Sequence, residues 1–187
     1  MEKHKTCSFF GHRKIEIDDV LKQQLTNCVE NLILSHNVQT FLFGSNSNFN
    51  DLCHSVVSQL KQKYPCLKRV RYTCKNETCT LEIDREKHEQ VFSALLKKQV
   101  HLLGFEEEFE HKTKYQAGKA SYIERNQAII NDSDFCVFYY DENYLPPINT
   151  TSRFPLDASA NSGTMIAYKY AIRKKKQIIN LKQKDKD

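Results

Sequence analysis

The sequence contains no long hydrophobic run, no secretory leader and no internal repeat. A membrane-spanning helix needs about 20 consecutive apolar residues, and no run in this chain approaches that length. Residues 1–5 are mostly charged and lead directly into a predicted strand, without the apolar stretch and cleavage site of a signal peptide. These absences argue against a membrane partner, and we expect a cytoplasmic protein.

The sequence also lacks a paired-cysteine metal motif. Cys74 and Cys79 are separated by four residues, but no second pair with matching spacing completes a tetrahedral zinc site. Cys7 and Cys136 stand in strand patterns, which is typical of small buried hydrophobic residues in a reducing compartment. We expect no metal and no cofactor.

The sequence also lacks a concentration of basic residues large enough to suggest binding to nucleic acid. The 28 basic and 23 acidic residues give a net charge of +5, and much of the excess lies in Arg173–Lys176 at a predicted helix end. An acidic run, Glu106–Glu110, opposes it. Binding to a phosphate backbone needs a concentrated basic face, so a nucleic acid partner is not favoured.

The stretch from Ala120 to Asp141, ASYIERNQAIINDSDFCVFYYD, organises the predicted fold. Ile123 and Ile130 stand seven residues apart, as on one face of a helix. Residues 131–134 are turn formers, and residues 135–140 form an apolar run typical of a strand buried on both faces. About twenty residues later, a new helical pattern begins at Ser162.

Similar units fill the rest of the chain. We predict strands at 6–10, 40–43, 69–73 and 177–181, and helices at 16–36, 51–64 and 162–174. With right-handed crossovers, the five strands form a doubly wound, mostly parallel Rossmann-like α/β sheet in the order 3-2-1-4-5. The alternating charged and apolar residues at 69–73 favour an edge strand. The length predicts a single domain over residues 1–187.

Residues 74–117 differ from this pattern. They contain a predicted helix at 85–99 and then the acidic run Glu106–Glu110. This segment is either a helical insertion over the ligand edge of the sheet or a helical crossover that only covers the sheet.

In a doubly wound sheet, ligands bind where the winding reverses, at the carboxyl ends of the strands. The loops at Gly11–Arg13, Gly44–Asp51 and Ser162–Thr164 fall on that edge. The guanidinium of Arg13 suits a phosphate, although a tight turn with a solvated arginine fits equally well. A serine N-cap followed by Gly163 lets a phosphate approach free helical amides.

Aromatic residues and a histidine also lie near this edge. His12 is the only histidine beside the predicted crevice, and it is either catalytic or simply solvated. Tyr139, Tyr140 and Tyr144 could stack on a base, but the first two end a buried strand, so at least one of them is expected in the core.

The order of these motifs resembles the SLOG superfamily, the Rossmann-like group that contains the lonely-guy phosphoribohydrolases and DNA-processing protein A. The resemblance rests on Glu124-Arg125-Asn126, the Ser133-Asp134 break, the apolar strand and Ser162-Gly163-Thr164. It covers most of the chain outside 74–117 and is sharpest for the uncharacterised bacterial YspA/YpsA-like branch. It implies that Arg125 is the functional arginine, and that the protein could form a homo-oligomer.

The resemblance also implies where this chain departs from the family. Residues 44–50 match a glycine-rich loop, but Ser45 replaces the second glycine and Asn50 stands where an aspartate is usual, with Asp51 next to it. The cleavage glutamate of the lonely-guy enzymes corresponds to Ala167. N-glycoside hydrolysis needs a carboxylate, so its loss argues against that mechanism unless another acid replaces it. The candidates for that role are Asp134, Asp141 and Asp157.

The sequence therefore predicts a cytoplasmic protein that binds a nucleotide-derived small molecule as a sensor or carrier. The alternatives are a phosphoribohydrolase-like N-glycosidase, with Arg125 as a catalytic residue, and a DNA-binding module. Whether the protein is an enzyme stays open at this point. The predicted ligand-binding residues are Gly11, His12, Arg13, Gly44, Ser45, Asn46, Asn50, Asp51, Arg125, Asn126, Ser162, Gly163 and Thr164.

Overall fold

The computed structural model describes residues 4–44, 47–74, 104–112, 114, 119–144 and 162–182. Within these residues, strands and helices alternate along the chain. The strands are β1 (Lys5–Gly11), β2 (Val38–Phe43), β3 (Lys68–Cys74), β4 (Glu107–His111), β5 (Phe135–Tyr139) and β6 (Gln177–Asn180). The helices are α1 (Asp19–His36), α2 (Asn48–Lys63), α5 (Lys119–Asn131) and α6 (Gly163–Arg173).

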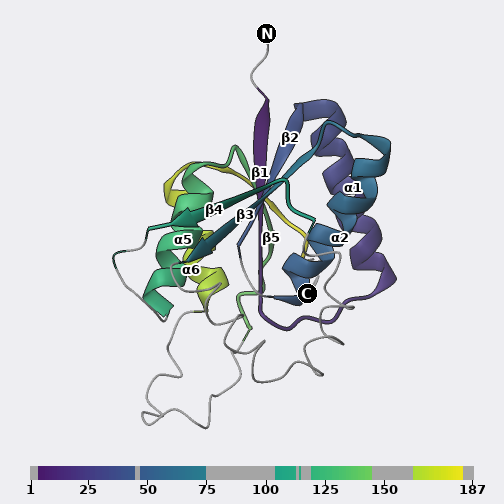
Figure 1. Cartoon of the computed structure of the whole chain (residues 1–187). Helices are drawn as coiled ribbons and strands as arrows, with labels where there is room; N and C mark the ends of the chain where they lie inside the picture. Colours follow the sequence, from purple (N-terminus) through teal and green to yellow (C-terminus); the bar gives the residue numbers. More distant parts are fainter. Residues whose placement is uncertain are drawn as a thin grey trace, which may run out of the picture.

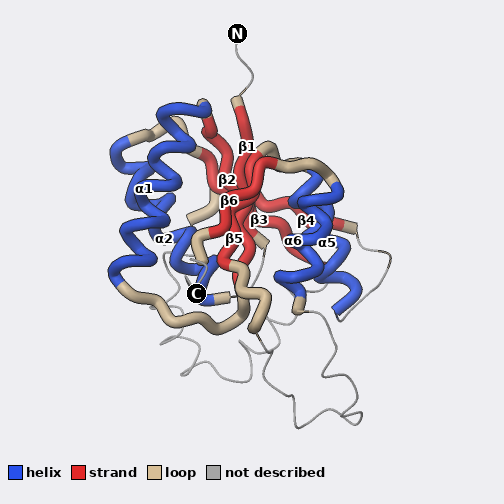
Figure 2. The backbone as a smooth tube through the Cα atoms, turned by 180° about the vertical axis from the view of Figure 1, so that it is seen from behind, coloured by secondary structure: helices blue, strands red, loops and turns tan. Residues whose placement is uncertain are grey.

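The described strands form one sheet in the order β4-β3-β2-β1-β5-β6, and every neighbouring pair is parallel. The helices α1 and α2 cover one face, and α5 and α6 cover the other (Figures 1 and 2). The predicted Rossmann-like architecture and the relative order of the five predicted strands are confirmed. The winding reverses between β1 and β5, so the ligand crevice is expected at their carboxyl ends.

The sheet has one strand more than predicted, because β4 extends it beyond β3. The strand at 69–73 is therefore not the edge, and residues 107–110 of the acidic run belong to the sheet. The parallel pairing with β3 is accompanied by ion pairs: the carboxylate of Glu107 lies 3.2 Å from Lys68 Nζ, and that of Glu108 lies 3.6 Å from Arg71 Nη1. Charged side chains that suggested a solvated edge instead face an acidic neighbouring strand. The predicted helix at 85–99 lies outside the described residues.

Each face of the sheet has its own apolar core. Along β1, Phe9 packs into the core under α1 and α2, while Phe10 packs into the core under α5 and α6. This alternation is what a strand covered on both faces requires. The helix α1 begins three residues later than predicted, because Asp18 caps it by accepting a hydrogen bond from the backbone N–H of Leu21 at 2.7 Å.

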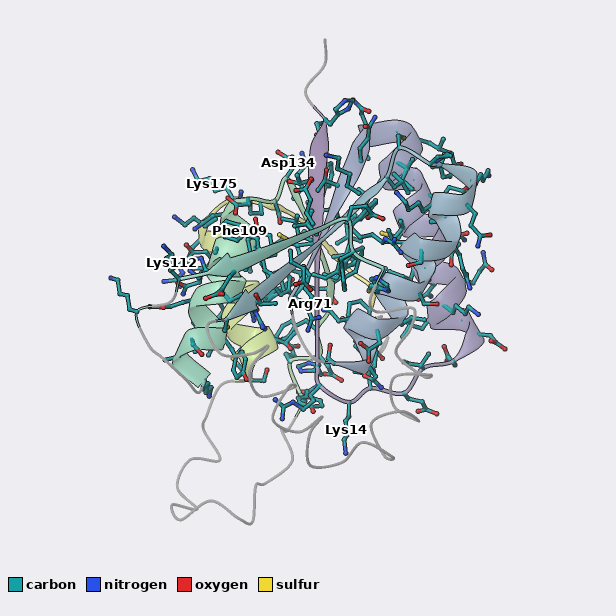
Figure 3. All side chains as sticks on the ribbon, viewed as in Figure 1. Lys14, Arg71, Phe109, Lys112, Asp134 and Lys175 are labelled. Atoms are coloured by element: carbon teal, nitrogen blue, oxygen red, sulfur yellow. The ribbon has the colours of Figure 1, made fainter. Side chains whose placement is uncertain are left out.

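The two ends of the parallel strands form two distinct edges of the molecule. Asp134 lies at the amino edge, where its carboxylate accepts a 2.8 Å hydrogen bond from the backbone N–H of Thr6. Lys14, just past β1, lies at the opposite end (Figure 3). Among the described helices, none has both the length and the apolar character needed to cross a membrane.

Candidate functional site

The carboxyl end of β1 is packed against the start of α2. A Cβ atom added to Gly11 would lie 2.5–2.6 Å from the Cβ, Cγ and Cδ1 atoms of Phe49. The side chain of Asn48 holds the following loop, because it donates to the carbonyl of Ile15 at 2.7 Å and accepts from the N–H of Ile15 at 3.1 Å. Gly11 therefore serves a close packing contact in this protein, and the neighbouring Arg13 is exposed.

The first turn of α2 is braced on the sheet. Asn50 is buried and donates its side-chain amide to the carbonyl of Phe9 at 3.1 Å. Asp51 is exposed. The two side chains therefore occupy different environments, and Asp51 does not take the place of Asn50. An amide at position 50 has a physical reason, because an ionised carboxylate has no proton to donate to Phe9. Ser45 and Asn46 lie outside the described residues.

The structure brings Gly44 and Arg125 together, although they are far apart in the sequence. Gly44 follows β2, and a Cβ atom added there would lie 2.4 Å from Cδ1 of Ile129 and 3.2 Å from Nε of Arg125. Arg125 comes from the middle of α5 and is 3% exposed. Its guanidinium carbon lies 5.1 Å from the ring centre of Tyr122, which is close enough for a cation–π contact. The guanidinium is thus fixed beside the carboxyl end of a central strand.

Asn126 follows Arg125 on α5 and is partly buried. Its Oδ1 atom is buried and accepts no hydrogen bond from any residue that the structure describes. Buried polar atoms usually have a partner, so this acceptor is a notable feature of the site.

The start of α6 has the predicted form. Ser162 caps the helix by accepting a hydrogen bond from the N–H of Met165 at 3.1 Å. Among the described residues, no atom lies within 4 Å of a Cβ added to Gly163, so these residues leave the space beside it open. Thr164 is buried. Ala167, the position of the lonely-guy glutamate, is 2% exposed and lies in the apolar core under α5 and α6.

His12 is buried, so the expectation of a solvated histidine is wrong. Its Nε2 atom lies 3.0 Å from the backbone nitrogen of Asp141, and its ring is stacked on Tyr144 with 3.8 Å between the ring centres. Burial lowers the pKa of His12, although the backbone carbonyl and the charge of Asp141 partly oppose this. His12 thereby joins the carboxyl ends of β1 and β5 at the reversal of the winding.

The structure also separates the candidate replacement carboxylates. Asp134 is at the amino edge, the wrong end of the sheet for this site. Asp141 is at the carboxyl edge, where it accepts from the N–H of Asn143 at 2.9 Å and lies 3.6 Å from Lys182 Nζ. Asp157 is outside the described residues. Within the part of the chain that is described, no group of three or more His, Cys, Asp or Glu side chains is placed to hold a metal ion.

Sequence reasoning missed Tyr168, whose ring stacks on that of Tyr140 at 4.5 Å. Tyr168 stands one helical turn after Thr164, and this spacing could have indicated that the two residues share a helical face.

A cavity of about 360 Å³ lies elsewhere, and none of the predicted ligand-binding residues lines it. Its lining residues are His111, Lys112, Lys114, Glu124, Gln127, Ala128, Asn131 and Tyr170.

Comparison with curated proteins finds no significant match. In a comparison with protein families, the model described as the YspA SLOG family matches residues 3–172, a range that contains the strands β1 to β5. This range includes the end of β1, the Gly44–Arg125 contact and the start of α6. The protein therefore belongs to the YspA SLOG family.

Proposed function

We propose that this protein binds a nucleotide or nucleotide derivative at the carboxyl edge of its sheet, as a sensor or carrier. The observation that carries the proposal is the contact between Gly44 and Arg125. Because Gly44 has no side chain, Ile129 and Arg125 pack directly against it at the carboxyl end of β2. A guanidinium presents paired donors that match a phosphate. Because α5 and the sheet fix this guanidinium, little conformational entropy is lost when it binds an anion.

The start of α6 supplies a second group of donors. The first N–H groups of a helix have no intrahelical partner, and the helix dipole favours an anion beside them. The open space at Gly163 leaves room for a phosphate oxygen next to these amides. The Ser162 hydroxyl is already engaged with Met165, so we assign it to shaping the helix start.

Asn126 supports a sugar next to the phosphate. Its buried Oδ1 atom accepts no hydrogen bond from the described residues, and a ribose hydroxyl is a donor of suitable size. Asn50, by contrast, is committed to Phe9, so we do not assign it to the ligand. We therefore place the ribose nearer to α5 than to the first turn of α2.

Binding without cleavage fits this site better than hydrolysis. An N-glycosidase needs a carboxylate near the developing oxocarbenium ion. Ala167 offers none, and Asp141 is held by Asn143 and Lys182. We therefore favour a sensor or carrier over a phosphoribohydrolase.

The test is thermal unfolding against a panel of nucleoside monophosphates, NAD, ADP-ribose and cyclic nucleotides. A ligand at a hundred times its Kd stabilises the folded state by about 2.7 kcal/mol. For a protein of this size, that raises the Tm by roughly 5–11 °C. The same mixtures are analysed for released base, whose absence is expected. Indifference to the whole panel would refute the proposal.

Variants connect the shift to the site. Arg125→Met should abolish the ligand-induced shift, and Arg125→Lys should retain only part of it, because an ammonium cannot form the paired hydrogen bonds of a guanidinium. The matched control is Arg173→Met, which removes an exposed arginine near the end of α6 and should leave the shift intact. Equal loss in both arginine variants would point to non-specific charge attraction.

A further inference from the structure

Four aromatic rings form a continuous chain across the carboxyl edge, at the reversal of the winding. Tyr144 stacks on His12 with 3.8 Å between ring centres and 17° between ring planes. His12 lies 5.9 Å from Tyr140, and Tyr140 stacks on Tyr168 at 4.5 Å and 24°. The rings come from the loop after β1, the end of β5 with its following loop, and α6. No element alone could assemble this row.

Hydrogen bonds fix the backbone that carries part of this row of rings. The side chain of Asn180, at the end of β6, accepts a hydrogen bond from the N–H of Tyr140 and donates one to its carbonyl, both at 2.9 Å. The backbone of Asp141 is held by His12. The tyrosines are nevertheless only partly buried, so part of each ring remains open to solvent. A fixed, partly exposed aromatic surface binds a flat ring at a low cost in conformational entropy.

His12 is the buried member of the row. The ring is 1% exposed, and its Nε2 atom is engaged with the backbone of Asp141. Its Nδ1 atom is buried and has no hydrogen-bond partner among the described residues. Burial also lowers the pKa of His12 below its ordinary value, which favours the uncharged ring. His12 therefore supports the neighbouring tyrosines from the interior, and the partly exposed tyrosine rings present the surface on which a base can stack.

The row of rings is connected to the start of α6 through Tyr168, which lies on the same helix. Tyr168 follows Gly163 by five residues, a rise of about 7 Å along the helix axis. The open helix start and the row of rings are therefore parts of one edge, joined by a single helix. A nucleotide also carries its phosphate and its base at two separate ends of one ribose.

We propose that Tyr144, Tyr140 and Tyr168, supported by the buried His12, form a platform on which the base of the bound nucleotide stacks. This inference rests on the proposed nucleotide-binding function and names the group that the site reads beyond phosphate and sugar. Base–aromatic stacking tolerates different bases, because every base has a flat face. The platform therefore selects nucleotides over sugar phosphates more strongly than it selects one base over another.

Calorimetric titration of the full chain tests the platform. The probes with a base are AMP, GMP and ADP-ribose, and the probe without a base is ribose 5-phosphate. Tyr144→Leu should weaken the binding of a probe with a base by roughly 5- to 150-fold, the range expected for losing one stacking contact. It should leave ribose 5-phosphate unchanged. Tyr144→Phe keeps the ring and should bind like the wild type.

The matched control is Tyr170→Leu, which removes a tyrosine of α6 whose hydroxyl donates to Asn131 and which is not part of the row. It should leave all affinities unchanged. Circular dichroism and thermal unfolding check that each variant is folded.

Two sets of results overturn the platform alone. In one, wild-type protein binds AMP, GMP or ADP-ribose no more tightly than ribose 5-phosphate. In the other, Tyr144→Leu weakens every probe equally or none. If no nucleotide in the thermal panel binds at all, the proposed function fails and the platform fails with it. The two failures are thus distinguishable.

Discussion

Replacing Gly11 with alanine should destabilise the folded protein, because β1 and α2 meet there without space for a methyl group. The added Cβ would lie 2.6 Å from Cβ of Phe49, whereas carbon atoms pack at about 3.5–4.0 Å. The contact is therefore about 1 Å too short. Rotation of the phenyl ring cannot relieve it, since the Phe49 Cβ is attached to the backbone. The start of α2 or the end of β1 must move, and such overpacking costs about 1–3 kcal/mol.

Urea unfolding followed by circular dichroism measures this loss. With a slope of about 2 kcal/mol per molar urea, a loss of about 2 kcal/mol lowers the midpoint by about 1 M. The matched control is Gly163→Ala, where no atom of the part of the chain that the structure describes lies within 4 Å of the new Cβ, and its midpoint should be unchanged or slightly raised. A wild-type midpoint for Gly11→Ala would refute the close packing of Gly11 against Phe49.

Three further predictions concern polar groups. Asn50→Asp places a carboxylate against the Phe9 carbonyl and should lower the free energy of unfolding by about 1–3 kcal/mol at neutral pH; an unchanged urea midpoint would contradict this. Burial alone would raise the pKa of Glu106, but hydrogen bonds and charge from Arg69 outweigh it and lower the pKa to about 2. The resulting stabilisation of the folded state is present above pH 4.5 and is lost as the pH falls through 2. The urea midpoint of Glu106→Gln should therefore fall less than that of the wild type over this pH range. If the midpoints of the two proteins fall in parallel, Glu106 is not the source of the effect. Because burial lowers the pKa of His12 below its ordinary 6.5, the unfolded state binds the proton more readily, and stability should fall as the pH drops through 6.5. His12→Phe should remove that part of the pH dependence, and an unchanged slope would show that His12 is not its source.

The prediction of the sheet succeeded where the pattern was local. The apolar run at 135–140 and the helical stripe before it required only periodicity, and right-handed crossovers then fixed the order of the five predicted strands. The strand β4 could not be recognised in this way. Its sequence, EEFEH, lacks an apolar alternation, and it joins the sheet by pairing with β3, where Arg71 lies opposite Glu108. Such pairing joins residues 37–39 positions apart, as in the bond between Arg69 and Glu106.

For the candidate site, too, the sequence indicated some features, and others depended on contacts between distant elements. The glycines, the Ser162 cap and the choice of Arg125 as a candidate ligand-binding residue followed from motif order and from resemblance to the family. The sequence could not indicate that Gly11 serves a contact with Phe49 or that Asn50 is committed to Phe9, because both depend on how closely α2 approaches β1. It also could not reveal that His12 is buried against Tyr144.

The sequence by itself determined the parallel α/β sheet, the edge at which a ligand is expected and the family, because periodicity and short motifs are local properties of the chain. The tertiary structure alone decided which side chains share that edge. It places Arg125 beside Gly44, excludes Asp134 by putting it at the opposite end of the strands, and aligns His12 with three tyrosines. Contacts between elements distant in the chain depend on packing, and packing is settled only when all the elements are in place.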